Sequence, residues 1–130
     1  MSEKEIPVIK DSGIREEFDT GSKRDTRDGK GRFDLLPTRA IARLARHFES
    51  GAKKYGDRNW ENGIKYSRVM GALKRHLDAW WDNEDTDPES GNNHLYHVLC
   101  NAMFLAHYVS YPKIYKDFDD RPHYEPKEKE

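Results

Sequence analysis

The sequence predicts an all-α protein, a small helical bundle with an extended N-terminal arm and a loose C-terminal tail. Two observations support this. Apolar residues recur at steps of three and four through the middle of the chain, and no segment shows the alternation of a half-buried strand. At 130 residues the chain fits one domain with a modest core. We therefore expect an arm over residues 1–34, a helical domain over residues 35–111 and a charged tail over residues 112–130.

The two ends differ from the middle in glycine, proline and charge. Apolar residues show no sustained periodic spacing over residues 1–34, which glycines interrupt and which alternate in charge over residues 23–28. We expect extended chain there, with short strands or turns. Residues 112–130 contain three prolines and finish in alternating lysine and glutamate, which predicts a loose end.

Three helices are predicted between these ends. The first follows Pro37 and Thr38 and ends at Tyr55, before Gly56. Its apolar face consists of Ile41, Leu44, Phe48, Ala52 and Tyr55. The second begins at Ser67 as a cap, and its inward face consists of Val69, Met70, Leu73, Leu77, Trp80 and Trp81. After a loop over residues 82–93, the third spans residues 93–110 and is expected to bury Leu95, Val98, Leu99, Ala102, Leu105, Ala106 and Val109.

Composition narrows the classes of function. Charged residues make up 36% of the chain but cancel to a net charge of -1, which argues against direct nucleic-acid binding and still allows a small anionic ligand. Only 35% of residues are hydrophobic, so the core of a single chain is small. We therefore expect copies of the chain to associate and bury additional apolar surface between them. Cys100 is the single cysteine, and the sequence shows neither a signal pattern nor an apolar run long enough for a membrane span. A cytoplasmic protein is expected.

A second stripe on the third helix carries the first candidate site. His94, His97 and Asn101 stand at i, i+3 and i+7 and share one side of the helix, which Phe104 and Tyr108 continue. Two neutral imidazoles at this spacing can reach one divalent metal, or one can orient a ligand while the other binds it. The alternative is a pair of solvated or hydrogen-bonded histidines on a helix flank.

Further candidates come from the first two helices. On the second helix, His76 lies at the boundary of the apolar face, while Arg75 and Asp78 point further outward. The alternative role for Asp78 is an exposed ion pair with Lys74, four residues earlier. Glu49 flanks the first helix, where it either approaches the imidazoles or pairs with Lys53. The acidic loop over residues 82–89 is expected to be mostly exposed, although hard cations favour such oxygens.

The end of the first helix and the loop after it suit a nucleotide. Cationic and polar groups there can neutralise phosphates, and aromatic rings can stack on a base. The candidate residues are Lys53, Lys54, Tyr55, Arg58, Asn59 and Trp60. The alternative is a basic helix end that complements the helix dipole, followed by a tryptophan anchored in the core.

Four blocks in this order resemble the phage dATP/dGTP diphosphohydrolase family, a group associated with MazG-like all-α nucleotide pyrophosphohydrolases. They are residues 25–37, residues 47–60 with His47-Phe48-Glu49 and Asn59-Trp60, Arg75-His76-Leu77, and the run from His94 to Asn101. The resemblance implies hydrolysis of a purine deoxynucleoside triphosphate, dGTP or dATP, to the monophosphate and pyrophosphate. It also implies Mg²⁺ or Mn²⁺, a homo-oligomer (dimer or tetramer), and in certain phages a link to 2-aminoadenine DNA.

The chain departs from the MazG-like pattern at the metal site. The acidic motifs expected there are replaced by His94-Leu95-Tyr96-His97 and by a segment in which only Asp78 is acidic. We expect Glu49, Asp78, His94 and His97 as metal ligands, and Glu49, His76, His94 and His97 as catalytic groups. The expected nucleotide contacts are Lys53, Lys54, Tyr55, Arg58, Asn59, Trp60, Arg75 and Asn101. The alternatives are a catalytically silent nucleotide-binding or regulatory module, and a phosphohydrolase of the His-Asp type.

Overall fold

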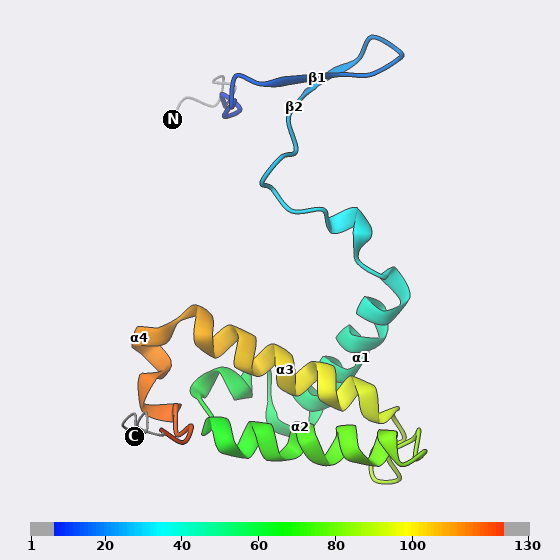
Figure 1. The fold of residues 1–130 in the computed structure, drawn as a ribbon, viewed down its shortest axis with the longest axis vertical. Helices are drawn as coiled ribbons and strands as arrows, with labels where there is room; N and C mark the ends of the chain where they lie inside the picture. The colour runs from blue at the N-terminus through cyan, green and yellow to red at the C-terminus, as the bar shows by residue number, and fades with distance from the viewer. Residues whose placement is uncertain (1–6, 124–130) are drawn as a thin grey trace, which may run out of the picture. The chain divides into compact units, whose positions relative to one another are not determined.

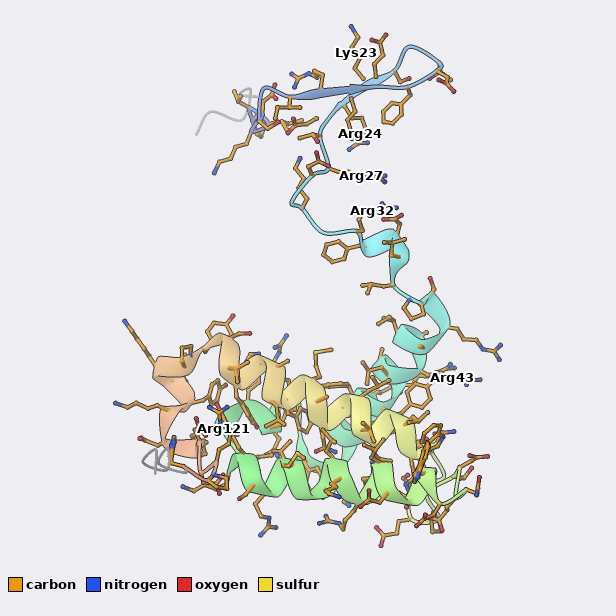
Figure 2. The ribbon with its side chains drawn as sticks, in the orientation of Figure 1. Lys23, Arg24, Arg27, Arg32, Arg43 and Arg121 are labelled. Carbon is orange, nitrogen blue, oxygen red and sulfur yellow. The ribbon has the colours of Figure 1, made fainter. Side chains whose placement is uncertain are left out.

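The computed structural model describes residues 7–123, and the chain divides after Leu36 into two units that are treated separately here. In the first unit, strand β1 (Arg15–Glu17) pairs antiparallel with β2 (Lys23–Asp25), with Arg15 opposite Asp25. A 3₁₀ turn at Phe33–Leu35 follows. Figure 2 shows the basic side chains Lys23, Arg24, Arg27 and Arg32 along β2 and the segment after it. Short strands in an extended segment agree with the expectation for this part of the chain.

The second unit is built from helices, as predicted. Its elements are α1 (Thr38–Tyr55), α2 (Tyr66–Trp81), α3 (His94–Ser110) and α4 (Pro112–Tyr115), with 3₁₀ turns at Asn59–Asn62 and Lys116–Phe118. Helices α2 and α3 lie side by side and run in opposite directions (Figure 1), and α3 also contacts α1. None of the described helices is both long and apolar enough to cross a membrane.

Local signals explain where the long helices begin and end. Gly56 closes α1 with a positive φ of 96°, and its N–H donates to the carbonyl of Ala52 over 2.7 Å. Asn93 caps α3, because its side chain accepts from the N–H of Leu95 over 2.9 Å. The predicted cap at Ser67 is wrong: α2 begins one residue earlier, and Asp120 accepts from the N–H of Ser67 over 2.8 Å.

The core of the helical unit is aromatic. Tyr66, Val69, Tyr108 and Tyr115 are buried together, and the rings of Tyr66 and Tyr108 are parallel at 5.8 Å. The hydroxyl of Tyr108 donates to the carbonyl of Trp60 over 2.6 Å, so the phenol is satisfied while its ring is fully buried. Burial also raises the pKa of Tyr108 to about 12.

The segment after residue 111 begins as part of this core and not as a loose tail. Pro112 opens α4, where a missing N–H costs nothing, and Tyr115 is buried with its hydroxyl donating to the carbonyl of Glu61 over 2.7 Å. Phe118 packs against Gly63. Prolines and charges suggested a loose end, but the two aromatic rings anchor the segment by burial. Residues 124–130 of the expected tail, like residues 1–6 of the expected arm, lie outside the described residues.

The faces of α2 and α3 are turned differently from the prediction. On α2, Met70, Leu77 and Trp81 are exposed, Trp81 by 77%. On α3, Leu99 and Val109 are exposed, while the stripe from His94 to Tyr108 faces inward. The sequence marks two apolar sides on α3, and packing against α2 selects the one that carries histidine and tyrosine.

Candidate functional site

Four histidines from three helices converge at one end of the α2–α3 pair. They are His47 on α1, His76 on α2, and His94 and His97 on α3. The rings of His76 and His97 stack in parallel at 4.0 Å, and the ring of His47 meets His97 edge-on at 4.3 Å. Asn92 holds His47 from the other side, since its amide donates to His47 Nδ1 over 3.1 Å.

The loop between α2 and α3 brings a buried carboxylate to these rings. The loop is folded on itself by a bridge between Thr86 and Asn93 and by the N–H of Asp87, which donates to the carbonyl of Asn92 over 2.8 Å. Asp87 is only 7% exposed, and its Oδ2 lies 3.2 Å from His97 Nε2. The Ser90 hydroxyl donates to Asp87 Oδ2 over 2.8 Å and lies 2.7 Å from His97 Nε2.

His76, Asp87 and His97 fit a divalent cation, and we call them the metal cluster. One ligand atom from each lies within 4.8 Å of the others. Ligands at about 2.1 Å from a metal are separated by about 3.0–3.5 Å, which agrees with the spacing between His97 and Asp87. Two imidazoles and a carboxylate suit a first-row transition metal better than Mg²⁺, which prefers oxygen; of the two expected ions, Mn²⁺ is the one that accepts imidazole more readily.

His94 contacts the metal cluster through His76 but is not a member of it. It is 4% exposed, and both of its ring nitrogens are occupied: Nδ1 lies 2.8 Å from His76 Nδ1, and Nε2 lies 2.7 Å from Glu84 Oε1. A metal ligand needs a free lone pair, so the structure does not place His94 as predicted. His94 instead contacts His76, which is a member of the metal cluster.

The electrostatics of the site keep the imidazoles neutral. Burial, followed by the charges of His47 and His76, lowers the pKa of His97 to about 4. Burial is also the main cause that lowers the pKa of His47 and of His76. Although burial opposes it, the hydrogen bond from Ser90 and the nearby imidazoles lower the pKa of Asp87. At neutral pH the cluster therefore presents neutral imidazoles and an ionised carboxylate, the forms that bind metals.

A cavity of about 820 Å³ opens beside the cluster. His97, Ser90 and Asn92 line it together with the aromatic residues Phe48, Trp60 and Phe104. Pockets of 300–1,000 Å³ with an apolar lining and a few polar groups are typical of small-ligand sites. The cavity is thus large enough for a ligand with a planar ring and an anionic end.

Most of the residues predicted for nucleotide contacts line this cavity. They are Lys54, Tyr55, Arg58, Asn59, Trp60 and Asn101. Trp60 is also a core residue, since its ring stacks on Phe104 at 4.7 Å, and Arg58 is paired with Glu61 at 2.5 Å. Lys53 and Arg75 are exposed and do not belong to the cavity lining.

Two of the predicted metal ligands lie outside the cluster. Glu49 lines the cavity, but its side chain is 68% exposed and pairs with Lys53 at 3.9 Å, while the α1 residue that reaches the imidazoles is His47. Asp78 is 62% exposed and pairs with Lys74 at 3.4 Å. Each carboxylate instead pairs with an exposed lysine four residues away on its own helix, and the residue of that helix that reaches the cluster is a histidine.

Sequence reasoning missed His47, Glu84, Asp87 and Ser90. His47 stands three residues after Leu44 and next to Phe48, on the apolar side of α1, so its spacing could have identified it. Asp87 precedes Pro88 in a turn and was grouped with exposed loop acids. No local pattern separates Asp87 from its acidic neighbours, because its burial depends on how the loop folds back toward α3.

The helical unit thus combines a cluster of histidines and a carboxylate with a cavity large enough for a nucleotide. The chain belongs to the dATP/dGTP diphosphohydrolase family: the model described as "dATP/dGTP diphosphohydrolase, N-terminal" matches residues 20–121. This confirms the family predicted from the four sequence blocks.

One relative is the dATP/dGTP diphosphohydrolase of Salmonella phage PMBT28, which is 36% identical over 86 residues. These residues make up 66% of this chain and 29% of the relative, so the chain spans less than a third of the relative's length. No solved structure matches the chain.

Proposed function

We propose that this chain hydrolyses purine deoxynucleoside triphosphates, dGTP, dATP or both, to the monophosphate and pyrophosphate with the aid of a divalent cation. The observation that carries the proposal is the metal cluster, of which His97 lines a cavity that aromatic and cationic residues also line. The name of the phage relative and the family model support the choice of substrate.

His76, Asp87 and His97 would hold the metal, and of the two expected ions we favour Mn²⁺ over Mg²⁺ because of the imidazoles. When bound, the ion supplies charge neutralisation for the triphosphate and a lowered pKa for a bound water. The buried position of Asp87 keeps its carboxylate directed at His97. Asn101 holds the α3 backbone there, since its amide donates to the carbonyl of His97 over 2.8 Å.

The cavity would hold the nucleotide. Lys54, beside the ring of Tyr55 at 5.1 Å, and Arg58 offer cations for the phosphates. The exposed ring of Tyr55 is free to stack on a base, whereas Trp60 is fixed against Phe104 and offers an edge of the wall. Tyr55 is therefore our first choice for the base contact.

The test is pyrophosphate release from each deoxynucleoside triphosphate by the full chain, with Mn²⁺ and then with Mg²⁺. We expect turnover of dGTP or dATP, and we expect His97→Ala and Asp87→Asn each to lower the rate by more than about 100-fold. Asp78→Asn is the matched control, because that carboxylate is exposed and should leave the rate unchanged.

The other outcomes separate the rival functions. Nucleotide binding by calorimetry without any product would indicate a silent binding module. Release of inorganic phosphate or tripolyphosphate would indicate a His-Asp type of phosphohydrolase. Full activity in both His97→Ala and Asp87→Asn would reject the metal cluster as the catalytic centre.

Three further proposals concern the setting of the reaction. We propose a homo-oligomer, because large apolar side chains on α2 and α3 are exposed, among them Met70, Trp81 and Leu99. We also propose a cytoplasmic location, with which a single free cysteine, Cys100, agrees. The resemblance to the phage enzymes is the support for a role in 2-aminoadenine metabolism.

A further inference from the structure

We propose that Glu84 and His94 form a positioning pair that keeps the proton of His76 on Nδ1, so that Nε2 of His76 presents its lone pair to the metal. The inference rests on the proposed function in taking His76, Asp87 and His97 as a metal site. Neither Glu84 nor His94 needs to touch the metal or the substrate for this role.

The hydrogen-bond partners decide where each proton lies. An ionised carboxylate only accepts, so the contact of 2.7 Å between Glu84 Oε1 and His94 Nε2 places a proton on His94 Nε2. The contact of 2.8 Å between the two Nδ1 atoms holds one proton, and the contact with Glu84 already places the proton of His94 on Nε2. In the proposed arrangement, His94 accepts through the lone pair of Nδ1, and His76 carries its proton on Nδ1. The remaining nitrogen of His76, Nε2, is left without a proton and can coordinate a cation.

The surroundings hold this chain of contacts in place. His94 is buried, so water has little access to its ring. The N–H of Glu84 donates to the carbonyl of Ala79 over 3.0 Å, and the N–H of His94 donates to the carbonyl of Asp85 over 2.9 Å. These two bonds tie the loop to the end of α2 and to the start of α3. Glu84 thereby stays beside His94, although 55% of its own side chain is exposed.

Without the carboxylate, the protons can rearrange. His94 could then carry its proton on Nδ1 and donate to His76, which would move the proton of His76 to Nε2. That tautomer cannot bind a metal through Nε2 until the proton is released or the ring turns over. Outer partners that orient a metal-bound histidine usually change metal affinity by about 10- to 100-fold.

The experiment is a titration of the metal-free full chain with Co²⁺, followed by its visible absorption and by calorimetry. We expect Glu84→Ala to weaken Co²⁺ binding by about 10- to 100-fold. Glu84→Gln should stay within about threefold of the wild type, because its amide oxygen still accepts from His94 Nε2. If Glu84 acted through its charge alone, Glu84→Gln would lose as much affinity as Glu84→Ala, and the inference would be overturned.

Asp85→Ala is the matched control, since it removes the neighbouring exposed carboxylate while leaving the backbone carbonyl that binds His94. It should bind Co²⁺ as the wild type does. A second measurement needs no variant: long-range ¹H–¹⁵N correlation spectra of the metal-free chain should show the proton of His76 on Nδ1. A proton on Nε2 there would contradict the inference.

These measurements are independent of turnover. A chain that binds Co²⁺ with the expected variant pattern but releases no pyrophosphate would refute the proposed function and leave the positioning pair intact. A chain that releases pyrophosphate while Glu84→Ala binds Co²⁺ like the wild type would refute the positioning pair alone.

Discussion

The ring of His97 lies between those of His76 and His47, and its Nε2 faces a carboxylate and a hydroxyl. Such crowding is costly for a charged imidazole, because two neighbouring imidazoles would repel it and burial removes its water. The same crowding suits a metal ligand, which must be neutral to donate a lone pair. At the residue scale, the surroundings of His97 disfavour its protonated form and leave the neutral form, which can bind a metal cation.

This arrangement predicts how stability depends on pH in the metal-free chain. Burial and the neighbouring imidazoles lower the pKa of His97 from 6.5 to about 4, so between these values the unfolded state binds a proton that the native state does not. The free energy of unfolding should therefore fall as the pH decreases through this window, by up to about 1.4 kcal/mol per pH unit for one such histidine. The lowered pKa values of His47 and His76 act in the same direction.

Urea unfolding in the presence of a chelator, from pH 7 to pH 5, measures this slope. His97→Gln removes one of the titrating groups and should make the slope shallower. A free energy of unfolding that does not change over this range would show that the imidazoles are not held neutral by the fold.

At the scale of elements, the turn between Asn59–Asn62 and α2 depends on a single glycine. Gly63 has a φ of 105°, and a Cβ built on it would lie 2.4 Å from Cζ of Phe118. The ring of Phe118 occupies this space because its segment packs back on the turn through Tyr115. The turn therefore joins two parts of the chain that lie more than fifty residues apart.

We predict that Gly63→Ala destabilises the helical unit by more than Gly56→Ala. Both glycines have a positive φ, near 100°, so both variants pay the backbone strain of about 1–3 kcal/mol. Only Gly63 also meets a ring, whereas a Cβ at Gly56 has nothing within 4 Å. Thermal unfolding of the two variants measures the difference. Equal melting temperatures would contradict the prediction, because they would mean that the ring of Phe118 moves aside without lowering the stability of the helical unit.

At the scale of the whole molecule, the helical unit leaves apolar helix surface uncovered. Leu99 and Met103 stand one turn apart on α3 and are exposed by 43% and 46%. Fully burying a side chain of this size stabilises by about 1.5–3 kcal/mol, and a second copy that covers Leu99 and Met103 gains the part of this that corresponds to their exposed surface. The sequence pattern placed Leu99 in the core, and an interface between copies would satisfy that pattern.

We predict that the chain is a homo-oligomer and that Leu99→Glu or Met103→Glu lowers its mass in solution toward that of a monomer. The substitutions place a charge in the expected interface without touching the described core. Light scattering coupled to size exclusion measures the mass, and circular dichroism verifies that the variants are folded. Lys113→Glu, an exposed charge reversal on α4, is the control and should leave the mass unchanged. A monomeric wild type would contradict the prediction.

The sequence by itself determined the helical class, the span of the long helices to within a residue or so, the family, and several of the residues that line the cavity. These properties depend on local pattern: apolar spacing, the glycine after α1, the asparagine before α3, and short motifs in a set order. Lys54, Tyr55 and Arg58 could be assigned to a ligand site because they follow one another along the chain.

Only the tertiary structure decided which face of α3 is buried, that residues 112–118 belong to the core, and which groups form the metal cluster. His76, His97 and Asp87 come from α2, α3 and the loop between them, and His47 approaches from α1, so their meeting depends on how these elements pack. Glu49 and Asp78 were plausible ligands by residue type, but each is exposed and pairs with a lysine of its own helix. A helix offers several faces to its neighbours, and the free energy of packing the whole unit selects among them.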